Sequence, residues 1–135
     1  MDEYELYQTV PHVGEYRELR RVADLSEKSL EAAEIGLKNS LYGVSIRDYQ
    51  GLLIAMGRLI GDGGCFIQVT DIAVRPEHQG HGLGRRVMEA LMAYIDQSIP
   101  KTAFIGLFAD VPELYIKFGF QKAKESVPGM YYYNL

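Results

Sequence analysis

The feature that most constrains the fold is an apolar run, residues 69–74, which leads through Pro76 into a glycine-rich turn, residues 79–84. Apolar residues then recur every four positions from Leu83 to Ile95, which is the spacing of a helix. A helix N-terminus leaves about four backbone N–H groups without an intrahelical partner and carries roughly half a positive charge. Because glycine has no Cβ, a ligand can approach the backbone of such a turn closely. The stretch therefore predicts a strand, a turn and a helix that bind an anion such as a diphosphate.

The spacing of the glycines excludes two common nucleotide-binding motifs. A P-loop continues from glycine into Lys and then Ser or Thr, whereas Gly84 is followed by Arg85 and Arg86. A dinucleotide-binding turn needs its third glycine at the position where this chain has Arg85. Glycine-rich connections also often serve only the close packing of a strand against a helix. The turn by itself leaves an anion site and a packing role open.

Two further segments accompany the pattern Gln-x-x-Gly-x-Gly that begins at Gln79. Residues 71–76 read Asp-Ile-Ala-Val-Arg-Pro, and residues 114–120 read Leu-Tyr-Ile-Lys-Phe-Gly-Phe. In chain order and spacing, residues 71–76, the turn that begins at Gln79 and residues 114–120 resemble three segments of the GNAT superfamily of N-acetyltransferases. These are its fourth strand, its coenzyme A loop and its Leu-Tyr-x-Lys-x-Gly-Phe segment. The resemblance extends loosely over nearly the whole chain as an order of strands and helices.

Hydrophobic patterning predicts strands and helices along a single domain, residues 1–135. The strands expected from alternating or continuous apolar runs are 4–7, 41–46, 52–60, 65–74 and 103–108, followed by closing strands with Lys122 and residues 130–133. The helices expected from apolar spacing start near Gly14, after a cap at Ser26 or Ser29 with Leu30, Ala33 and Leu37 on one face, at the glycine-rich turn, and after Asp110 as N-cap. The run 103–108 is typical of a strand covered on both faces.

These elements predict an α/β protein, more closely α+β, with helices on both faces of a mixed sheet. This arrangement matches the GNAT order. The resemblance implies a mostly antiparallel sheet whose fourth and fifth strands splay apart.

Size and charge favour one globular domain and exclude several classes of protein. The chain has 135 residues, of which 47% are hydrophobic and 24% are charged, as in an ordinary folded domain. A net charge of −4 and scattered basic residues disfavour nucleic acid, and an acidic protein suits a cationic amine or a basic peptide end. No apolar run approaches the ~20 residues that a membrane span requires, and the first residues do not resemble a secretory leader. We therefore expect a cytoplasmic protein that does not bind a membrane.

The resemblance implies that acetyl-CoA is the cofactor and that an amine attacks its thioester directly, without a covalent acetyl-enzyme. In this fold the splayed fourth strand offers unpaired backbone groups to the pantetheine amides, as an added strand would. The cofactor-binding residues expected on these grounds are Ile72, Ala73 and Val74 on the strand and Gln79, Gly80, His81, Gly82, Leu83, Gly84 and Arg85 in the loop. Many relatives also contact pantetheine through an asparagine at the position of Phe108.

Two residues are expected to carry the chemistry. Tyr115 stands where the family has its general acid, and a phenol can protonate a departing thiolate. It is also one of ten tyrosines, and a packed amphipathic side chain is the alternative. Asp71 is the nearest acid for a general base, with a structural role in fixing the loop and a water relay left open. Gln68 stands where some members carry glutamate, and it cannot take up the proton.

The histidines and the cysteine do not predict a metal site. His78 and His81 lie three residues apart in the phosphate loop, and the neighbouring sequence offers no third ligand. Cys65 is the single cysteine, so the chain has no internal disulfide. We expect Cys65 inside a strand as a buried small hydrophobe.

The sequence thus predicts an N-acetyltransferase that moves an acetyl group from acetyl-CoA to a primary amine of a small molecule or peptide. A domain that binds coenzyme A without catalysis, as a sensor or interaction module, is the alternative, which Gln68 and Phe108 support and Tyr115 opposes. An acyl group larger than acetyl is a third possibility. Tyr42 and residues 131–133 are candidates for an aromatic acceptor slot, although tyrosines on closing strands more often form core or dimer contacts. From the resemblance we expect a homodimer.

Overall fold

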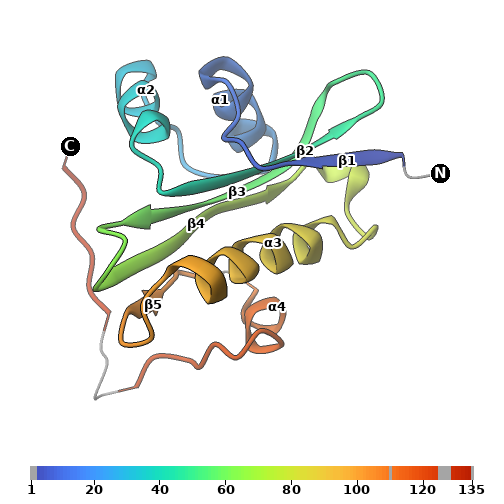
Figure 1. Ribbon diagram of the computed structural model, residues 1–135. Helices are drawn as coiled ribbons and strands as arrows, with labels where there is room; N and C mark the ends of the chain where they lie inside the picture. The colour runs from blue at the N-terminus through green and yellow to red at the C-terminus, as the bar shows by residue number, and fades with distance from the viewer. Residues whose placement is uncertain (1–2, 110, 125–128, 135) are drawn as a thin grey trace.

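The computed structural model describes residues 3–109, 111–124 and 129–134, and its elements follow the expected order (Figure 1). The strands are β1 (Tyr4–Tyr7), β2 (Tyr42–Asp48), β3 (Leu53–Gly61), β4 (Phe66–Val74) and β5 (Phe104–Gly106). The helices are α1 (Val13–Val22), α2 (Leu30–Lys38), α3 (Leu83–Ser98) and α4 (Pro112–Ile116), with a 3-10 turn, η1, at Pro76–His78.

The five strands form one mixed sheet in the order of the sequence. Strands β1 to β4 are antiparallel, and β5 pairs in parallel with β4. Strand β3 pairs with β4 from Gly61 opposite Ile67 to Ala55 opposite Val74, whereas β5 pairs only with residues 66–68. Among the described residues, no strand pairs with the edge of β4 that faces away from β3 between residues 69 and 74. This confirms the expected sheet, mostly antiparallel and splayed between β4 and β5.

Helices cover both faces of the sheet, as expected (Figure 1). Helices α1 and α2 lie on one face and form a core with Leu53, Met56 and Ala73. Helix α3 lies on the other face, where its buried side chains pack against β2, β3 and β4. Burial of a leucine-sized side chain stabilises a fold by about 1.5–3 kcal/mol. The two cores hold β4 and the start of α3 in a fixed relation.

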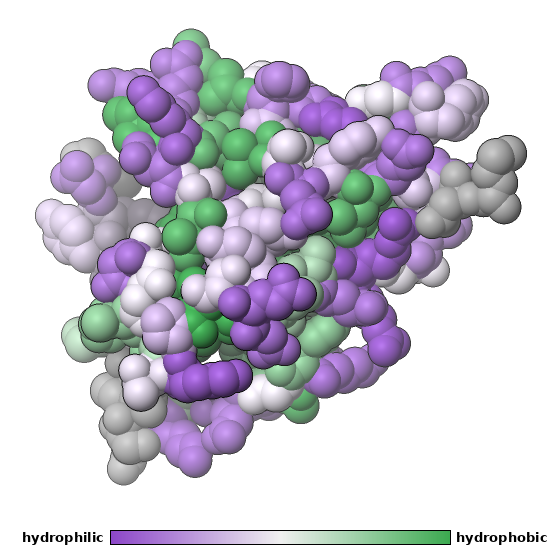
Figure 2. Space-filling model, viewed as in Figure 1, coloured by the Kyte–Doolittle hydropathy of each residue, from purple (hydrophilic) through white to green (hydrophobic). Residues whose placement is uncertain are grey.

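Helix α2 begins at the expected cap, but one of the three residues predicted for its buried face is exposed. The Ser29 hydroxyl accepts a hydrogen bond from the Ala32 amide at 3.1 Å, and Ala33 and Leu37 are buried as predicted. Leu30 is 49% exposed, because it is the first helical residue and lies beyond the surface that α1 covers. Figure 2 shows hydrophobic residues gathered over α2 at the top of the molecule, and hydrophilic residues scattered over the rest of that face.

Cys65 is exposed and precedes β4, so its predicted burial inside a strand is wrong. The reason is the turn before the strand. One carboxylate oxygen of Asp62 accepts hydrogen bonds from the amides of Gly64, Cys65 and Phe66 at 2.8, 2.8 and 3.1 Å. An aspartate that accepts from successive amides holds its neighbours in a turn, and the extended backbone begins only at Phe66.

The C-terminal part of the chain differs most from expectation. The predicted strand 103–108 contracts to β5, and Phe104 and Phe108 are exposed rather than covered. Residues 121–124 and 129–134 form no helix or strand, so the closing strands predicted there are wrong for these residues. Strand β5 has three residues and offers little backbone ladder to a further strand. Helix α4 is capped by Val111, and the predicted cap, Asp110, lies outside the described residues.

Candidate active site

The glycine-rich loop has a conformation that only glycine adopts easily. Gly80 and Gly82 have φ angles of 87° and 74°, and Gly82 is the N-cap of α3. Left-handed backbone is strained for residues that carry a Cβ. A Cβ at either glycine would nevertheless meet no atom of the described residues within 4 Å. Close packing therefore does not account for these two glycines, and the space in front of them is open.

The first turn of α3 directs backbone donors into this open space. The first hydrogen bond of the helix runs from the Arg86 amide to the Gly82 carbonyl at 3.1 Å, and no side chain of the described residues caps the helix. The amides of Leu83, Gly84 and Arg85 are the donors that a helix N-terminus leaves without an intrahelical partner. Together with the positive end of the helix dipole, they can bind an anion.

The side chains of the loop differ in what they can contribute. The side-chain amide of Gln79 donates a hydrogen bond to the Val74 carbonyl at 3.3 Å, which connects the loop to the end of β4. Leu83 is buried in the core and offers only its backbone. Arg85 is exposed beside the loop, with Nε 3.3 Å from a carboxylate oxygen of Glu89. The hydroxyl of Tyr4 and Nδ1 of His78 are 2.7 Å apart, so β1 also supports the loop.

A cleft of about 770 Å³ runs from the loop along the open edge of β4. The predicted site residues that line it are Asp71, Ile72, Ala73, Val74, Gln79, Gly80, Gly84 and Tyr115. His81, Gly82, Leu83 and Arg85 do not line it and lie in the loop and in the first turn of α3. Gln68 and Phe108 line it as well.

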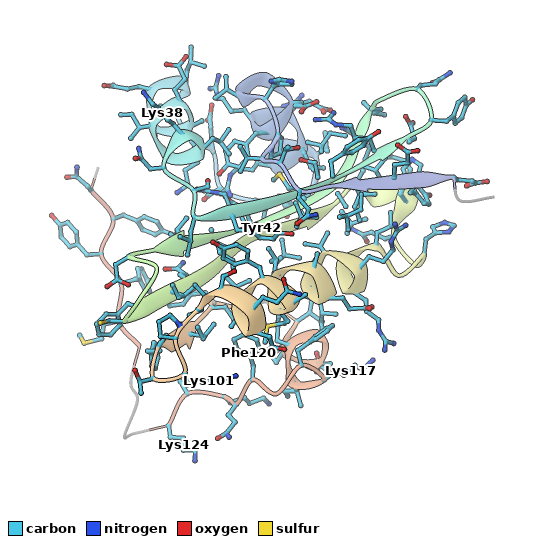
Figure 3. All side chains as sticks on the ribbon, in the orientation of Figure 1. Lys38, Tyr42, Lys101, Lys117, Phe120 and Lys124 are labelled. Carbon is cyan, nitrogen blue, oxygen red and sulfur yellow. The ribbon has the colours of Figure 1, made fainter. Side chains whose placement is uncertain are left out.

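Helix α4 brings Tyr115 to the cleft from a distant part of the sequence. Pro112 occupies the first helical position, where its fixed φ is compatible with a helix. The Tyr115 ring meets the Phe120 ring edge-on, with 6.4 Å between centroids. Phe120 and Lys117 are labelled beside α4 in Figure 3, and the Lys117 side chain is exposed.

A bulge in β4 determines where Asp71 lies. The pairing with β3 shifts between Met56 opposite Ala73 and Arg58 opposite Thr70, and Asp71 has a φ of 60°. An extra residue of this kind interrupts the alternation of side chains along a strand. Thr70 and Asp71 consequently lie on the same face, toward α1 and α2, and line one cavity there.

Asp71 is the centre of a buried ion-pair network. Its carboxylate accepts hydrogen bonds from the Arg20 guanidinium, from Nε of Arg58 at 2.6 Å and from the Tyr16 hydroxyl at 2.7 Å. The side chains of Arg20, Asp71 and Arg58 are 8%, 5% and 13% exposed. Burial and the charge of Asp71 raise the pKa of Tyr16. Burial is the largest single influence on the pKa of Arg58 and lowers it, but the hydrogen bond to Asp71, the charge of that carboxylate and Tyr16 together raise the pKa.

Three members of this network, Tyr16, Arg20 and Arg58, were not predicted as site residues. Arg20 follows Tyr16 by four residues and therefore shares the inward face of α1, while Arg58 follows Met56 by two residues in β3. Charged residues are almost never buried without a partner. A charged residue at a position that the periodicity assigns to the core was the signal that could have identified them.

Asp71→Asn should destabilise the fold by about 3 kcal/mol, because loss of one partner leaves buried charge on Arg20 and Arg58 uncompensated. Urea unfolding followed by circular dichroism measures this change. Asp24→Asn is the matched control, since Asp24 is exposed and has a φ of 63°. The control should change stability by less than about 0.5 kcal/mol. An equally small change for Asp71→Asn would contradict a stabilising network.

Two other features, a metal cluster and a membrane-spanning helix, are absent from the described residues. These residues contain no group of three or more His, Cys, Asp or Glu side chains that could hold a metal ion. Among the helices of the same residues, none has both the length and the apolar character that a membrane crossing requires.

Comparisons with known proteins match the chain over these same elements. Residues 40–122 match the family model of the acetyltransferase (GNAT) domain. The uncharacterized N-acetyltransferase ycf52 of Pyropia yezoensis is 31% identical over 110 residues, which cover 79% of this chain and 63% of that protein. A histone acetyltransferase of Glycine max is 32% identical over 136 residues, which cover 98% of this chain and 58% of that protein. The chain thus spans about three fifths of the length of these two relatives.

Solved structures share the fold. A protein of unknown function from meticillin-resistant Staphylococcus aureus, named a probable acetyltransferase, is 40% identical with a TM-score of 0.90, and the match covers 97% of this chain and 99% of that one. A GNAT family N-acetyltransferase of Escherichia coli, solved in complex with CoA, has a TM-score of 0.67 at 19% identity and covers 88% of this chain and 69% of that one. The match to the family model, residues 40–122, covers more than half of this chain, which therefore belongs to the GNAT acetyltransferase family.

Proposed function

We propose that this protein binds acetyl-CoA in the cleft beside β4 and transfers the acetyl group to a primary amine. The observation that carries the proposal is the meeting, in one cleft, of an open strand edge and a helix N-terminus whose glycines have open space in front of them. Family membership supports acetyl transfer, and GNAT relatives from Escherichia coli and Brucella melitensis were solved with CoA and with acetyl-CoA.

The cofactor would be held largely by backbone. The amides of Leu83, Gly84 and Arg85, with His81 and the Arg85 guanidinium nearby, suit the diphosphate. Gly80 and Gly82 leave room for it. The edge of β4 at residues 72–74, which has no partner strand among the described residues, suits the pantetheine amides, which would add to the sheet as an extended segment adds to an exposed edge. The bound cofactor supplies an activated acetyl group.

In the transfer itself, the neutral amine nitrogen bonds to the thioester carbonyl carbon, the carbon–sulfur bond breaks, and the nitrogen loses a proton. Tyr115 would donate its hydroxyl proton to the departing thiolate. Both carboxylate oxygens of Asp71 already accept hydrogen bonds, so it would act as a positioning residue rather than as the base. Gln68 lines the cleft and can hydrogen-bond a water molecule, which would carry the amine proton to solvent.

Calorimetric titration with acetyl-CoA is the direct test of the proposal, followed by an amine screen that detects thiol release. Saturable binding at micromolar concentrations and release of thiol with at least one amine are the expected results. Binding without turnover for any amine would favour a non-catalytic coenzyme A-binding module. Absence of binding would overturn the proposal, because every step depends on the loop holding the diphosphate.

The acceptor, the oligomeric state and the location remain predictions. The relatives include proteins named a histone acetyltransferase and a serotonin N-acetyltransferase, so both peptide and small-molecule amines stay candidates for this chain.

We expect a homodimer in the cytoplasm. Exposed side chains at Met130 and Tyr131–Tyr133 offer an apolar contact surface. Sedimentation equilibrium should give about twice the 15.2 kDa chain mass, and a monomer mass would contradict the dimer.

A further inference from the structure

A second cavity, of about 340 Å³, lies on the α1 and α2 side of β4. Arg20, Thr70 and Asp71 line both this cavity and the cleft described above, so the two spaces meet at the bulge of β4. Lys28 and Arg58 line the cavity from the other sides. If an acceptor molecule places its amine in the cleft and extends past the bulge, the rest of the molecule would lie in or beside this cavity.

The cavity has an excess of positive charge. Arg20 and Arg58 both pair with Asp71, and in the described part of the chain no other carboxylate forms a salt bridge with either. Two guanidinium groups against one carboxylate leave one positive charge, and the Lys28 ammonium adds another. Buried charge without a partner is costly. An anion that entered here would offset that cost.

The geometry also leaves a guanidinium donor for such an anion. In Arg58, Nε donates to Asp71, and Nη1 donates to the Gly36 carbonyl and to the Ser40 hydroxyl, both at 3.0 Å. None of these three hydrogen bonds uses Nη2, and the Tyr16 side chain also contacts the guanidinium. Because Arg58 lines the cavity, its guanidinium can reach an anion that enters there. Guanidinium groups bind carboxylates and phosphates more strongly than neutral donors do.

We propose that this cavity binds an anionic group, a carboxylate or a phosphate, that the acceptor amine itself carries. The acceptor is then an amino acid, a peptide end with a nearby acidic group or an amino phosphate, rather than a simple cationic amine. This inference rests on the proposed acetyl transfer. It reverses the expectation drawn from the net charge of −4, because the nearest charges determine the field at short range while distant ones are screened.

The test measures binding of matched probes to protein that is saturated with CoA, so that the diphosphate loop is occupied. One arm compares ω-amino acids, from glycine to 6-aminohexanoate, with n-alkylamines of the same chain length. The other compares O-phosphoethanolamine with ethanolamine and distinguishes phosphate from carboxylate. We expect calorimetry to show roughly tenfold tighter binding of the best anionic probe, the gain typical of one charged hydrogen bond. Equal binding of anionic and matched neutral probes in both arms would overturn the inference.

Calorimetry does not require turnover, so failure of this inference is distinguishable from failure of acetyl transfer. A protein that releases thiol with alkylamines but shows no preference for anionic probes would retain the proposed function and lose the anionic subsite. A protein that prefers anionic probes without turnover would keep the subsite and lose the transfer.

Variants of the cationic side chains sharpen the test. Arg58→Gln should remove most of the preference, and Arg58→Lys, which keeps the charge, should retain part of it. If Arg58→Gln does not fold, Lys28→Gln serves instead, since Lys28 is exposed and lines the same cavity. It should reduce the preference severalfold. Lys38→Gln is the matched control, because Lys38 lies at the end of α2, where Figure 3 labels it, and does not line the cavity. Equal effects of the Lys28 and Lys38 variants would count against the subsite.

Discussion

Gly82→Val should reduce acetyl-CoA affinity at least a hundredfold. Gly82 has a φ of 74°, which a β-branched residue adopts only with strain, and it is the N-cap of α3. The space that a side chain would enter holds no atom of the described residues within 4 Å of the Cβ position, so valine would fill the volume in front of the α3 amides. A loss of about 3 kcal/mol corresponds to this factor. Calorimetric titration with acetyl-CoA measures it.

Two further variants separate the causes of that loss. Gly14→Ala is the matched control: a Cβ there also meets no atom within 4 Å, and the backbone of α1 is an ordinary helix. The affinity of the Gly14→Ala protein for acetyl-CoA should equal that of the unmodified protein. Gly82→Ala adds the backbone strain with little bulk and should give an intermediate affinity. Undiminished binding by Gly82→Val would mean that the diphosphate is held elsewhere.

Tyr115→Phe should lower the turnover number by about 10²–10⁴-fold and leave the acetyl-CoA dissociation constant unchanged. The substitution removes the hydroxyl that would protonate the thiolate, but it keeps the ring and its edge-on contact with Phe120. Binding is expected to persist because the loop and β4 hold the cofactor through backbone groups. Initial rates of thiol release at saturating acetyl-CoA, together with calorimetry, measure the two quantities separately.

Tyr49→Phe is the control for this substitution, since Tyr49 is exposed in the connection between β2 and β3 and does not line the cleft. It should leave both quantities unchanged. A Tyr115→Phe protein with full turnover would remove Tyr115 from the role of general acid. A large loss of affinity would instead indicate that the hydroxyl helps to hold the cofactor.

Local signals were sufficient to predict the first four strands and the three longer helices, whereas the splay between β4 and β5 was expected only from the family resemblance. Alternation and helical spacing are strong in these segments, and the glycines of the loop have positive φ at Gly80 and Gly82, where the chain requires them. The position of Cys65 was missed because one aspartate side chain, Asp62, overrides the strand propensity of its neighbours. The closing strands were predicted wrongly for another reason. A strand needs a neighbouring strand for its hydrogen bonds, and the apolar character of residues 130–133 does not reveal that β5, the nearest candidate, has only three residues.

The site could be predicted only in part. Sequence motifs indicate candidate cofactor-binding residues, but they do not indicate ion pairs between residues that lie far apart in the sequence. Asp71 was identified from its segment, but its partners Arg20 and Arg58 lie on α1 and β3, and only the folded chain brings them together. Their charges changed the expected acceptor from a simple cation to an amine that carries an acidic group. Net charge, summed over the whole chain, could not reveal a local excess of the opposite sign.

The bulge at Asp71 also limits how the gene for this protein can change in length. Residues 67 and 69 face α3, whereas after the bulge Ile72 faces α3 and Ala73 faces α1. Deletion of Asp71 would restore simple alternation but remove the carboxylate that pairs with Arg20 and Arg58, whereas deletion of a residue elsewhere in β4 would send one half of the strand to the wrong side of the sheet. Insertions in the exposed connection between β2 and β3 carry no such penalty. Lineages of this protein should therefore vary in length at that connection and keep the length of β4 constant.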